Sequence, residues 1–402
     1  MTTGADGLAT FNNLALGAYI VTETQTPAGY TGSRPFIITV PMTHPTELNK
    51  WVYDVHAYPK NAKVNVEKEV DDAQTPAVGS PISYTITADV PDAPVVDYYN
   101  VVDQYDKRVD LPEGQIELRM VEAKDGEVDL VKGDDYTLIP AVGKDGKTKF
   151  WTAEFTEAGR KKMIAQRKSN DTKIVMSLEG TLKEKIGDEG LVENKAVLLP
   201  GAPANNWTPG SGEVPPPDYP NAKVVSKFGK VTITKTSSVD DTKKLQGAEF
   251  QVYKCKPTTK PANNFESVDA SLDTKLTVDG KDTFVTDDQG KVTIDGLRNN
   301  DWEDNEEVAD PGYYCLVETK APDGYELQSR PIAFQILASN STDANKYTLE
   351  TTVKDVPKNG GFNLPLTGAA GVGVLIGTGA LLVAGSGAIV LANKRRKEQA
   401  DA

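Results

Sequence analysis

One stretch of alternating strand and turn signals occurs twice in this sequence, once close to its start and once near its end. Residues 17–41 read GAYIVTETQTPAGYTGSRPFIITVP, and residues 312–335 read GYYCLVETKAPDGYELQSRPIAFQ. Each copy passes from an aromatic residue through an apolar strand to Glu-Thr, a proline turn, Gly-Tyr and Arg-Pro. The repeat predicts two related domains. Because glycine or proline separates short strand-like runs elsewhere too, the sequence predicts an all-β fold of sandwich domains.

Composition argues against several classes of function. The 402 residues carry a formal net charge of −14, from 44 basic and 58 acidic side chains. A nucleic-acid-binding protein would present a basic face, so no nucleic-acid partner is expected. Only two cysteines and two histidines occur, so the sequence offers few residues for a His/Cys metal site or a histidine-dependent catalytic triad. No phosphate-binding glycine motif is visible, and we expect neither a cofactor nor an enzyme.

The C-terminal region predicts a membrane segment. Residues 369–392 read AAGVGVLIGTGALLVAGSGAIVLA, an uncharged run of membrane-spanning length. The basic run KRRK follows at residues 394–397, shortly before the chain ends. Positive charge on the cytoplasmic side would place the preceding residues outside the cell. An exported chain needs a signal peptide, and the first twenty residues lack one. Since the first copy of the repeat begins near residue 1, we expect the front of the first domain to be missing.

A second, shorter repeat indicates where domains begin. YPKNAKVNVEK at residues 58–68 resembles YPNAKVVSKFGKVTITK at residues 219–235, and each passes from Tyr-Pro into a strand with a lysine. The second copy follows a Pro/Gly-rich stretch at residues 200–220, which is typical of a semi-rigid linker or an extended edge. The expected boundaries are 1–60, 61–220 and 221–357, with a C-terminal tail over 358–402.

Three motifs together carry a family resemblance. YPKN resembles a pilin motif, and YCLVETKAPDGY resembles a pilin E-box, whose glutamate Glu23 repeats in the first domain. The third motif resembles a cell-wall sorting signal and consists of Leu364, Pro365, Leu366, Thr367 and Gly368. With the apolar span and basic tail, the chain resembles the backbone pilins of Gram-positive, sortase-assembled pili. The resemblance implies tandem immunoglobulin-like domains of the Cna type, followed by a transmembrane sorting helix.

The resemblance also implies a polymerisation chemistry. A sortase would cleave after Thr367 and hold it as a thioester, and the amine of Lys60 in another subunit would attack that thioester. The implied partners are sortase, other copies of the chain, tip or base pilins, cell-wall peptidoglycan and, before sorting, the membrane. The implied location is a pilus attached to the cell wall. The alternative is a monomeric, wall-anchored adhesin that uses the sorting signal but not Lys60.

Pilins of this kind also hold their domains with internal Lys–Asn or Lys–Asp isopeptide bonds. Burial lowers the pKa of a lysine and raises that of a carboxyl group, so a neutral amine can attack a carbonyl polarised by a protonated acid. In the middle domain, which resembles the Cna-A type, the resemblance implies Lys68 as the amine and Asn194 as the acceptor. Asp103 is the expected acid, and Asp106 is a nearby alternative.

In the third domain, which resembles the Cna-B type, the same reasoning implies Lys235 as the amine and Glu318 as the acid. The usual acceptor is an asparagine, whereas this chain has Asp355 in that place, with Asn359 as the nearby alternative. An aspartate acceptor would release water instead of ammonia. No crosslink is predicted for the first domain, although Asp54 occupies a place like that of Asp355.

The two cysteines, Cys255 and Cys315, both fall on expected strands of the third domain. An even number of cysteines in an exported protein favours a disulfide bond. The sequence therefore predicts a Cys255–Cys315 disulfide.

Overall fold

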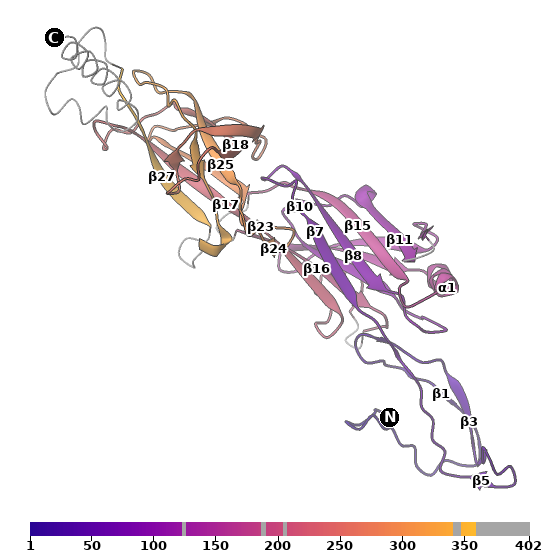
Figure 1. Cartoon of the computed structure of the whole chain (residues 1–402). Helices are drawn as coiled ribbons and strands as arrows, with labels where there is room; N and C mark the ends of the chain where they lie inside the picture. Colours follow the sequence, from indigo (N-terminus) through magenta and orange to yellow (C-terminus); the bar gives the residue numbers. More distant parts are fainter. Residues whose placement is uncertain (123–125, 186–189, 204–206, 341–346, 359–402) are drawn as a thin grey trace, which may run out of the picture.

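A computed structural model describes most of the chain, namely residues 1–122, 126–185, 190–203, 207–340 and 347–358. These residues form an elongated molecule of three β-rich parts arranged end to end, and we call them the first, middle and third domains (Figure 1). The all-β prediction is confirmed. In the described part of the chain no helix is long and apolar enough to cross a membrane. The sorting signal, the apolar run 369–392 and Asn359 lie outside the described residues.

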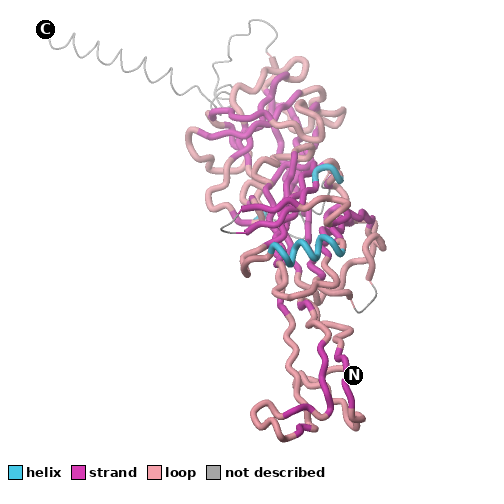
Figure 2. Tube along the Cα trace, turned by 90° about the vertical axis from the view of Figure 1, so that its right-hand side faces the viewer, coloured by secondary structure: helices cyan, strands magenta, loops and turns pink. Residues whose placement is uncertain are grey.

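The first domain consists of short antiparallel strand pairs at one end of the molecule (Figures 1 and 2). The pairs are β1 (Gly17–Val21) with β3 (Phe36–Val40), β2 (Tyr30–Thr31) with β6 (Ala62–Lys63), and β4 (Met42–Thr43) with β5 (Trp51–Val52). Strand β5 lies at the tip of the molecule, and the chain runs back from it toward the middle domain through residues 53–61 (Figure 1).

Two sheets and one short helix make up the middle domain. The first sheet contains β7 (Val66–Asp71), β8 (Pro81–Asp89), β10 (Val109–Asp110), β11 (Ile116–Glu122), β12 (Gly126–Asp129) and β15 (Lys173–Leu182). The second contains β9 (Asn100–Asp106), β13 (Tyr136–Val142), β14 (Thr148–Phe155), β16 (Leu191–Leu199) and the start of β17 (Asn221–Ser237). A one-turn helix η1 (Glu113–Gln115) precedes β11, and α1 (Glu157–Gln166) begins after Thr156, whose hydroxyl accepts the Gly159 N–H. Such an N-cap satisfies one of the free N–H groups of the first helical turn.

The third domain is also a two-layer arrangement. The end of β17 pairs with β22 (Lys291–Arg298) and, in parallel, with β27 (Thr348–Asp355). The facing sheet contains β18 (Glu249–Pro257), β19 (Glu266–Ser267), β20 (Ala270–Lys275), β21 (Phe284–Val285), β25 (Tyr313–Lys320) and β26 (Ile332–Phe334). The remaining elements are β23 (Trp302–Glu303), β24 (Glu306–Glu307) and the one-turn helix η2 (Ala338–Asn340). Apolar side chains from both sheets, including Ile233, Phe250 and Leu316, form one buried core between the layers.

The middle and third domains share a continuous strand. Residues 221–227 of β17 pair with β16 in the middle domain, whereas residues 228–234 pair with β22 in the third. At the junction Arg298 contacts the buried carboxylate of Asp72 at 3.3 Å, and the Trp302 indole N–H donates to Val225 O at 2.7 Å. The shared strand β17, the Arg298–Asp72 ion pair and the Trp302 hydrogen bond all cross the junction. These contacts hold the two domains together as one extended body.

Candidate functional site

Strand alternation places a lysine in the core of the third domain. Side chains on one face of a strand recur every second residue, so Lys235 points inward with Val231 and Ile233 on β17. Its side chain is fully buried, and its Nζ lies 2.8 Å from Glu318 Oε1. It also forms an ion pair with Asp355, which the parallel pairing of β17 and β27 brings alongside. The three predicted residues therefore meet in one buried cluster.

The surroundings of this cluster are apolar on one side and polar on the other. The Phe250 ring centroid lies 5.4 Å from Lys235 Nζ, and Glu318 Oε2 accepts the Gln328 backbone N–H at 2.8 Å. Burial raises the pKa of Asp355 to about 6, while Lys235 opposes that shift. A carboxyl group with such a pKa is protonated in a larger fraction of molecules near neutral pH than an ordinary aspartate.

The middle domain contains a second buried amine. Lys68 lies on β7 between Val66 and Val70, on the face that packs into the core. Its Nζ lies 2.7 Å from Asp103 Oδ1, and both side chains are fully buried. The Tyr84 ring centroid is 5.1 Å from the same nitrogen. Burial lowers the pKa of Lys68 and raises the pKa of Asp103, so each group is driven toward its neutral form.

Asn194 lies beside this pair on β16, a strand that runs antiparallel to β9 with Ala196 opposite Asp103. It is 1% exposed and lowers the pKa of Asp103, against the larger effect of burial. Within the described residues neither of its side-chain amide atoms has a hydrogen-bond partner. Asp106 faces away from the cluster and pairs with Arg108 at 2.6 Å. Asn194 therefore places a buried amide next to an amine and a carboxyl group.

Both clusters contain the groups that an amide-forming condensation requires. Each has an amine, a carbonyl acceptor and a separate carboxyl group that can act as the acid, all within a water-poor interior. Attack of the amine on the acceptor carbon would form a C–N bond, and ammonia or water would leave with a proton from the amine. The reaction would remove buried charges, which are costly in an apolar core.

The first domain places its E-box glutamate against the pilin motif. Glu23 Oε1 accepts the Asn61 side-chain N–H at 2.9 Å, and Glu23 Oε2 accepts the Ser33 backbone N–H at 3.2 Å. Sequence reasoning did not single out Asn61, although it directly follows Lys60 in YPKN. Lys60 itself is exposed. Asp54 is also exposed and lies 3.5 Å from His56, so it does not share the buried setting of Asp355.

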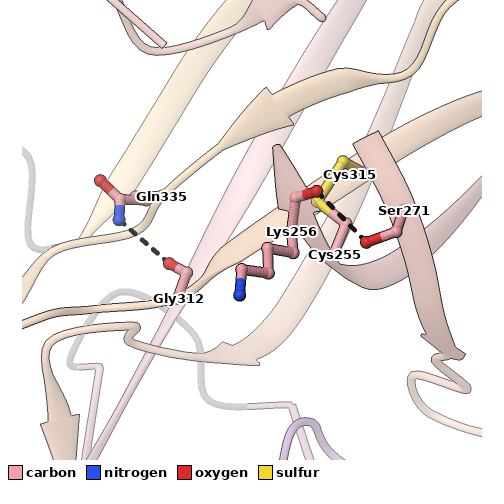
Figure 3. Close-up of a disulfide and its surroundings, with 6 residues drawn as sticks. All are labelled: Cys255, Lys256, Ser271, Gly312, Cys315 and Gln335. Carbon is pink, nitrogen blue, oxygen red and sulfur yellow. Dashed lines mark hydrogen bonds between the residues drawn. A yellow bond between two sulfur atoms is a disulfide. The ribbon is translucent and has the colours of Figure 1, made fainter. Parts of the chain in front are cut away.

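The predicted disulfide is present and joins two neighbouring strands of the third domain (Figure 3). Cys255 on β18 bonds to Cys315 on β25, with Cα atoms 5.7 Å apart. Glu318 lies three residues further along β25, where Phe250 of β18 pairs with it. The disulfide therefore fixes the two strands that carry the acid and the aromatic ring next to Lys235.

Sequence reasoning also missed the rings beside the two lysines. Tyr84 and Phe250 occupy inward positions of strands that alternate clearly, so their burial could have been predicted. Their contact with a particular lysine depends on which strands pack together, which the alternation does not specify.

Comparison with known proteins gives matches along most of the chain. A family model described as the Gram-positive pilin subunit D1, N-terminal domain, matches residues 1–62, and one described as the SpaA prealbumin-like fold domain matches residues 229–352. The fimbrial subunit type 1 of Actinomyces viscosus is 42% identical over 98% of this chain and 76% of its own length. The fimbrial subunit type 2 of Actinomyces naeslundii is 32% identical over 99% of this chain and 73% of its own length.

Solved structures agree with these matches. The fimbrial protein FimP from Actinomyces oris superposes with a TM-score of 0.64 at 36% identity and covers 86% of this chain and 79% of its own. The full-length major pilin SpaD from Corynebacterium diphtheriae superposes with a TM-score of 0.62 at 30% identity and covers 89% of this chain and 83% of its own.

Proposed function

Because this chain belongs to the fimbrial subunits, the pilins of Gram-positive bacteria, we propose that it is joined into a polymer through Lys60 and Thr367. Its function is structural rather than enzymatic, as a subunit of a cell-surface pilus. Polymerisation accounts for these relatives better than the monomeric adhesin does. The proposal concerns the two residues that form the link and the sortase that joins them.

One observation carries the assignment of Lys60. The lysine is exposed in the extended segment that joins the tip of the first domain to β6, in a chain that also has LPLTG at residues 364–368. Pro59 fixes the local backbone dihedral, and the strand pairing of Ala62 with Thr31 anchors the segment two residues later. These constraints hold an accessible amine in a defined direction.

The proposed joining reaction has two steps. A sortase cysteine attacks the Thr367 carbonyl carbon, the Thr367–Gly368 bond breaks, and the new amine of Gly368 leaves with a proton. The Lys60 amine of another subunit then attacks the thioester, which forms an amide and releases the thiol. Since a protonated amine is a poor nucleophile, the lysine must lose its proton in the sortase complex. The last subunit would pass instead to peptidoglycan, after release from its membrane-anchored precursor.

We further propose that the two buried clusters become internal isopeptide bonds, Lys68–Asn194 in the middle domain and Lys235–Asp355 in the third. Asp103 and Glu318 act as the acids that polarise the acceptor carbonyl. The buried contacts of each lysine with its acid support these roles. The division at residues 60, 220 and 357 is likewise our proposal.

Replacing Lys60 by arginine tests the joining reaction. Guanidinium keeps the positive charge but stays protonated, so it is a far poorer nucleophile. In cells with the matching sortase, the wild type should give a covalent ladder that survives boiling in detergent. Lys60→Arg should give single subunits that are still attached to the wall, because LPLTG is intact. Lys50→Arg, at an exposed lysine of the same domain, is the matched control and should leave the ladder unchanged.

Two outcomes would contradict the proposal. A normal ladder from Lys60→Arg would remove Lys60 from the reaction. Attachment of single wild-type subunits, without any ladder, would favour the adhesin.

A further inference from the structure

The Pro/Gly-rich stretch that the sequence predicts as a linker or an extended edge covers the outer face of the second middle-domain sheet. Neighbouring residues of a strand point to opposite faces, and on β16 both faces are apolar. Leu198 belongs to the domain core, whereas Leu199 belongs to a separate buried cluster on the outer face. Two aromatic side chains of the stretch complete that cluster, each 7% exposed: Trp207 and Tyr219. We call residues 200–203 and 207–220 the outer layer.

Hydrogen bonds hold the outer layer to the sheet beneath it. Pro220 O accepts the Leu198 backbone N–H at 2.9 Å, and the Trp207 indole N–H donates to Glu213 O at 2.8 Å. The Glu213 side chain pairs with Lys144, which follows β13 in the sheet. Because backbone and side-chain contacts both anchor it, the outer layer is part of the folded middle domain.

The first domain contacts the outer layer through one short segment. The Thr31 hydroxyl donates to Pro200 O at 3.3 Å, and Thr31 is 3% exposed. Ala28 packs against the apolar cluster of the outer layer. Gly29 is buried with a φ of +79°, and a Cβ placed on it would lie 3.1 Å from Pro220 Cγ. The two domains therefore approach closely at a backbone conformation that favours glycine.

The same segment also holds the chain that follows the pilin motif. Strand β2 pairs with β6, so Thr31 lies opposite Ala62, two residues after Lys60. The Val64 backbone N–H donates to Gly29 O at 3.0 Å. Strands β2 and β6 have two residues each, and so short a pair is not stable without packing against the rest of the fold. Their position therefore depends on the contact of this segment with the outer layer.

We propose that the outer layer positions Lys60 for the joining reaction, through the Thr31–Pro200 hydrogen bond and the packing of Ala28. This inference rests on the proposed joining of Lys60 to Thr367. Sortase would bind Lys60 in the conformation that the docked segment fixes. When the segment leaves the outer layer, only the docked fraction of molecules can react, so the apparent affinity of sortase for the acceptor chain falls with that fraction.

Thr31→Val tests this positioning in the full chain. Valine keeps the shape of threonine without the hydroxyl, and loss of one buried hydrogen bond should shift the docking equilibrium about fivefold toward the undocked segment. With sortase and an excess of a labelled LPLTG peptide as donor, KM for the acceptor chain should rise at unchanged kcat. Thr31→Ser keeps the hydroxyl and should restore the wild-type KM. Thr137→Val, at an exposed threonine of β13, is the matched control and should behave as the wild type does.

Hydrogen exchange measures the docking independently of sortase. The Val64 N–H should exchange faster in Thr31→Val, whereas the N–H of Ala196 in β16 should not change, because the middle domain stays folded. Ala28→Asp places a charge against the apolar cluster, leaves Thr31 intact and should have the same effects on exchange and on KM. Faster exchange of Val64 with an unchanged KM would overturn the positioning of Lys60. Unchanged exchange in both variants would overturn it as well, because the outer layer would not hold the segment.

An engineered disulfide provides a test by rescue. A Cβ placed on Gly201 of the outer layer would lie 2.8 Å from Thr26 Oγ1, so cysteines at these two positions are close enough to bond. Gly201→Cys with Thr26→Cys, added to Thr31→Val, should restore the wild-type KM when oxidised. Mild reduction, with the reductant removed before the assay, should raise KM again, whereas the native disulfide is protected because Cys315 is fully buried. A new disulfide that forms without restoring KM would overturn the positioning. Absence of any joining by the wild type would count against the proposed function instead.

Discussion

The buried lysines of the middle and third domains face different charge balances. Lys68 contacts one carboxyl group, Asp103, and its neighbouring acceptor is the neutral amide of Asn194. Lys235 contacts two carboxyl groups, Glu318 and Asp355. In the middle domain one amine and one acid can neutralise each other by sharing a proton. In the third domain Lys235 can neutralise only one of the two carboxyl groups. The other must either bind a proton or remain charged in an interior that excludes water.

This difference indicates how each domain would hold its reactants before they react. An aspartate acceptor can pair with the lysine, so the third domain has an ion pair before the bond forms. An asparagine acceptor cannot, so the middle domain depends on Asp103 alone to accommodate its buried amine. Asp103 should therefore contribute more to the stability of its domain before the bond forms than Glu318 does, although we assign both the same chemical role.

Removing Asp103 or Glu318 should have the largest effects on mass and stability. The size of the stability loss should differ between the two domains. Asp103→Ala and Glu318→Ala should each abolish the mass loss of their own domain, ammonia in the middle and water in the third. Asp103→Ala should lower stability more, because it leaves Lys68 without its carboxylate, whereas Lys235 keeps Asp355. Loss of one member of a buried ion pair costs about 3–5 kcal/mol, which corresponds to a fall in Tm of about 10 °C. Intact mass and calorimetry of each variant measure both effects.

Asp106→Ala is the matched control for the middle domain. Asp106 pairs with Arg108 on the other side of β9, so this variant should keep the crosslink and its ammonia loss. Because both side chains of this pair are largely buried, the variant should also lose some stability, and the mass is therefore the control measurement. If Asp106→Ala abolished the ammonia loss and Asp103→Ala did not, the assignment of the acid would be reversed.

The sequence could identify the lysines but not all their partners. The family resemblance implies Lys68 and Lys235 because each lies on the first strand of a domain that resembles a Cna type, and both lysines do lie on the first long strand of their domain. Asp103 and Asp106 were left as alternatives because both lie on β9, three residues apart and therefore on opposite faces. Only the packing of β9 against β7 shows which face meets Lys68.

The sequence also could not predict which strands far apart in the chain pair with each other. The parallel pairing of β17 with β27 joins segments separated by most of the third domain, and it brings Asp355 to Lys235. Likewise the contact of Glu23 with Asn61 joins the E-box to the pilin motif. Periodicity gives the faces of a strand but not its neighbours, whereas the disulfide could be predicted because only one pairing of two cysteines exists.

Removing the disulfide should affect the third domain alone. Cys255→Ser with Cys315→Ser opens a loop with a sequence separation of 60 residues, for which a typical destabilisation is about 2–4 kcal/mol. The loss should be smaller in the wild-type background than with Glu318→Ala, because a Lys235–Asp355 bond would already restrict the same part of the unfolded chain. Thermal unfolding of the wild type, the double cysteine variant, Glu318→Ala and their combination forms a complete cycle. Equal losses in both backgrounds would indicate that no such bond encloses the disulfide.

The pH dependence should distinguish the uncrosslinked third domain from the crosslinked one. Glu318→Gln should leave Asp355 unreacted, and burial, the largest cause, should still hold its pKa well above 3.8. Between the ordinary pKa and this raised pKa the folded state then binds more protons than the unfolded state, so stability falls as pH rises through this window. The slope cannot exceed about 1.4 kcal/mol per pH unit for one group. The wild type should lack this slope, because Asp355 would have become an amide. Denaturant unfolding at pH 4 to 7 measures it, and identical slopes would contradict the crosslink.

Exchanging the acceptors should have the smallest effect on the mature protein. Asp355→Asn gives the third domain the amide of the middle domain, and the bond to Lys235 would be the same amide whether water or ammonia leaves. The mature variant should therefore have the same mass and Tm as the wild type, although its unreacted forms differ. If Asn359 were the acceptor instead, Asp355 would survive, and the mature masses would differ by the difference between the two residues. The reciprocal change, Asn194→Asp, adds a second carboxyl group beside Lys68 and should also give a mature protein of wild-type mass. Equal masses in both exchanges, together with unequal rates of bond formation, would show that the charge balance before reaction distinguishes the two domains.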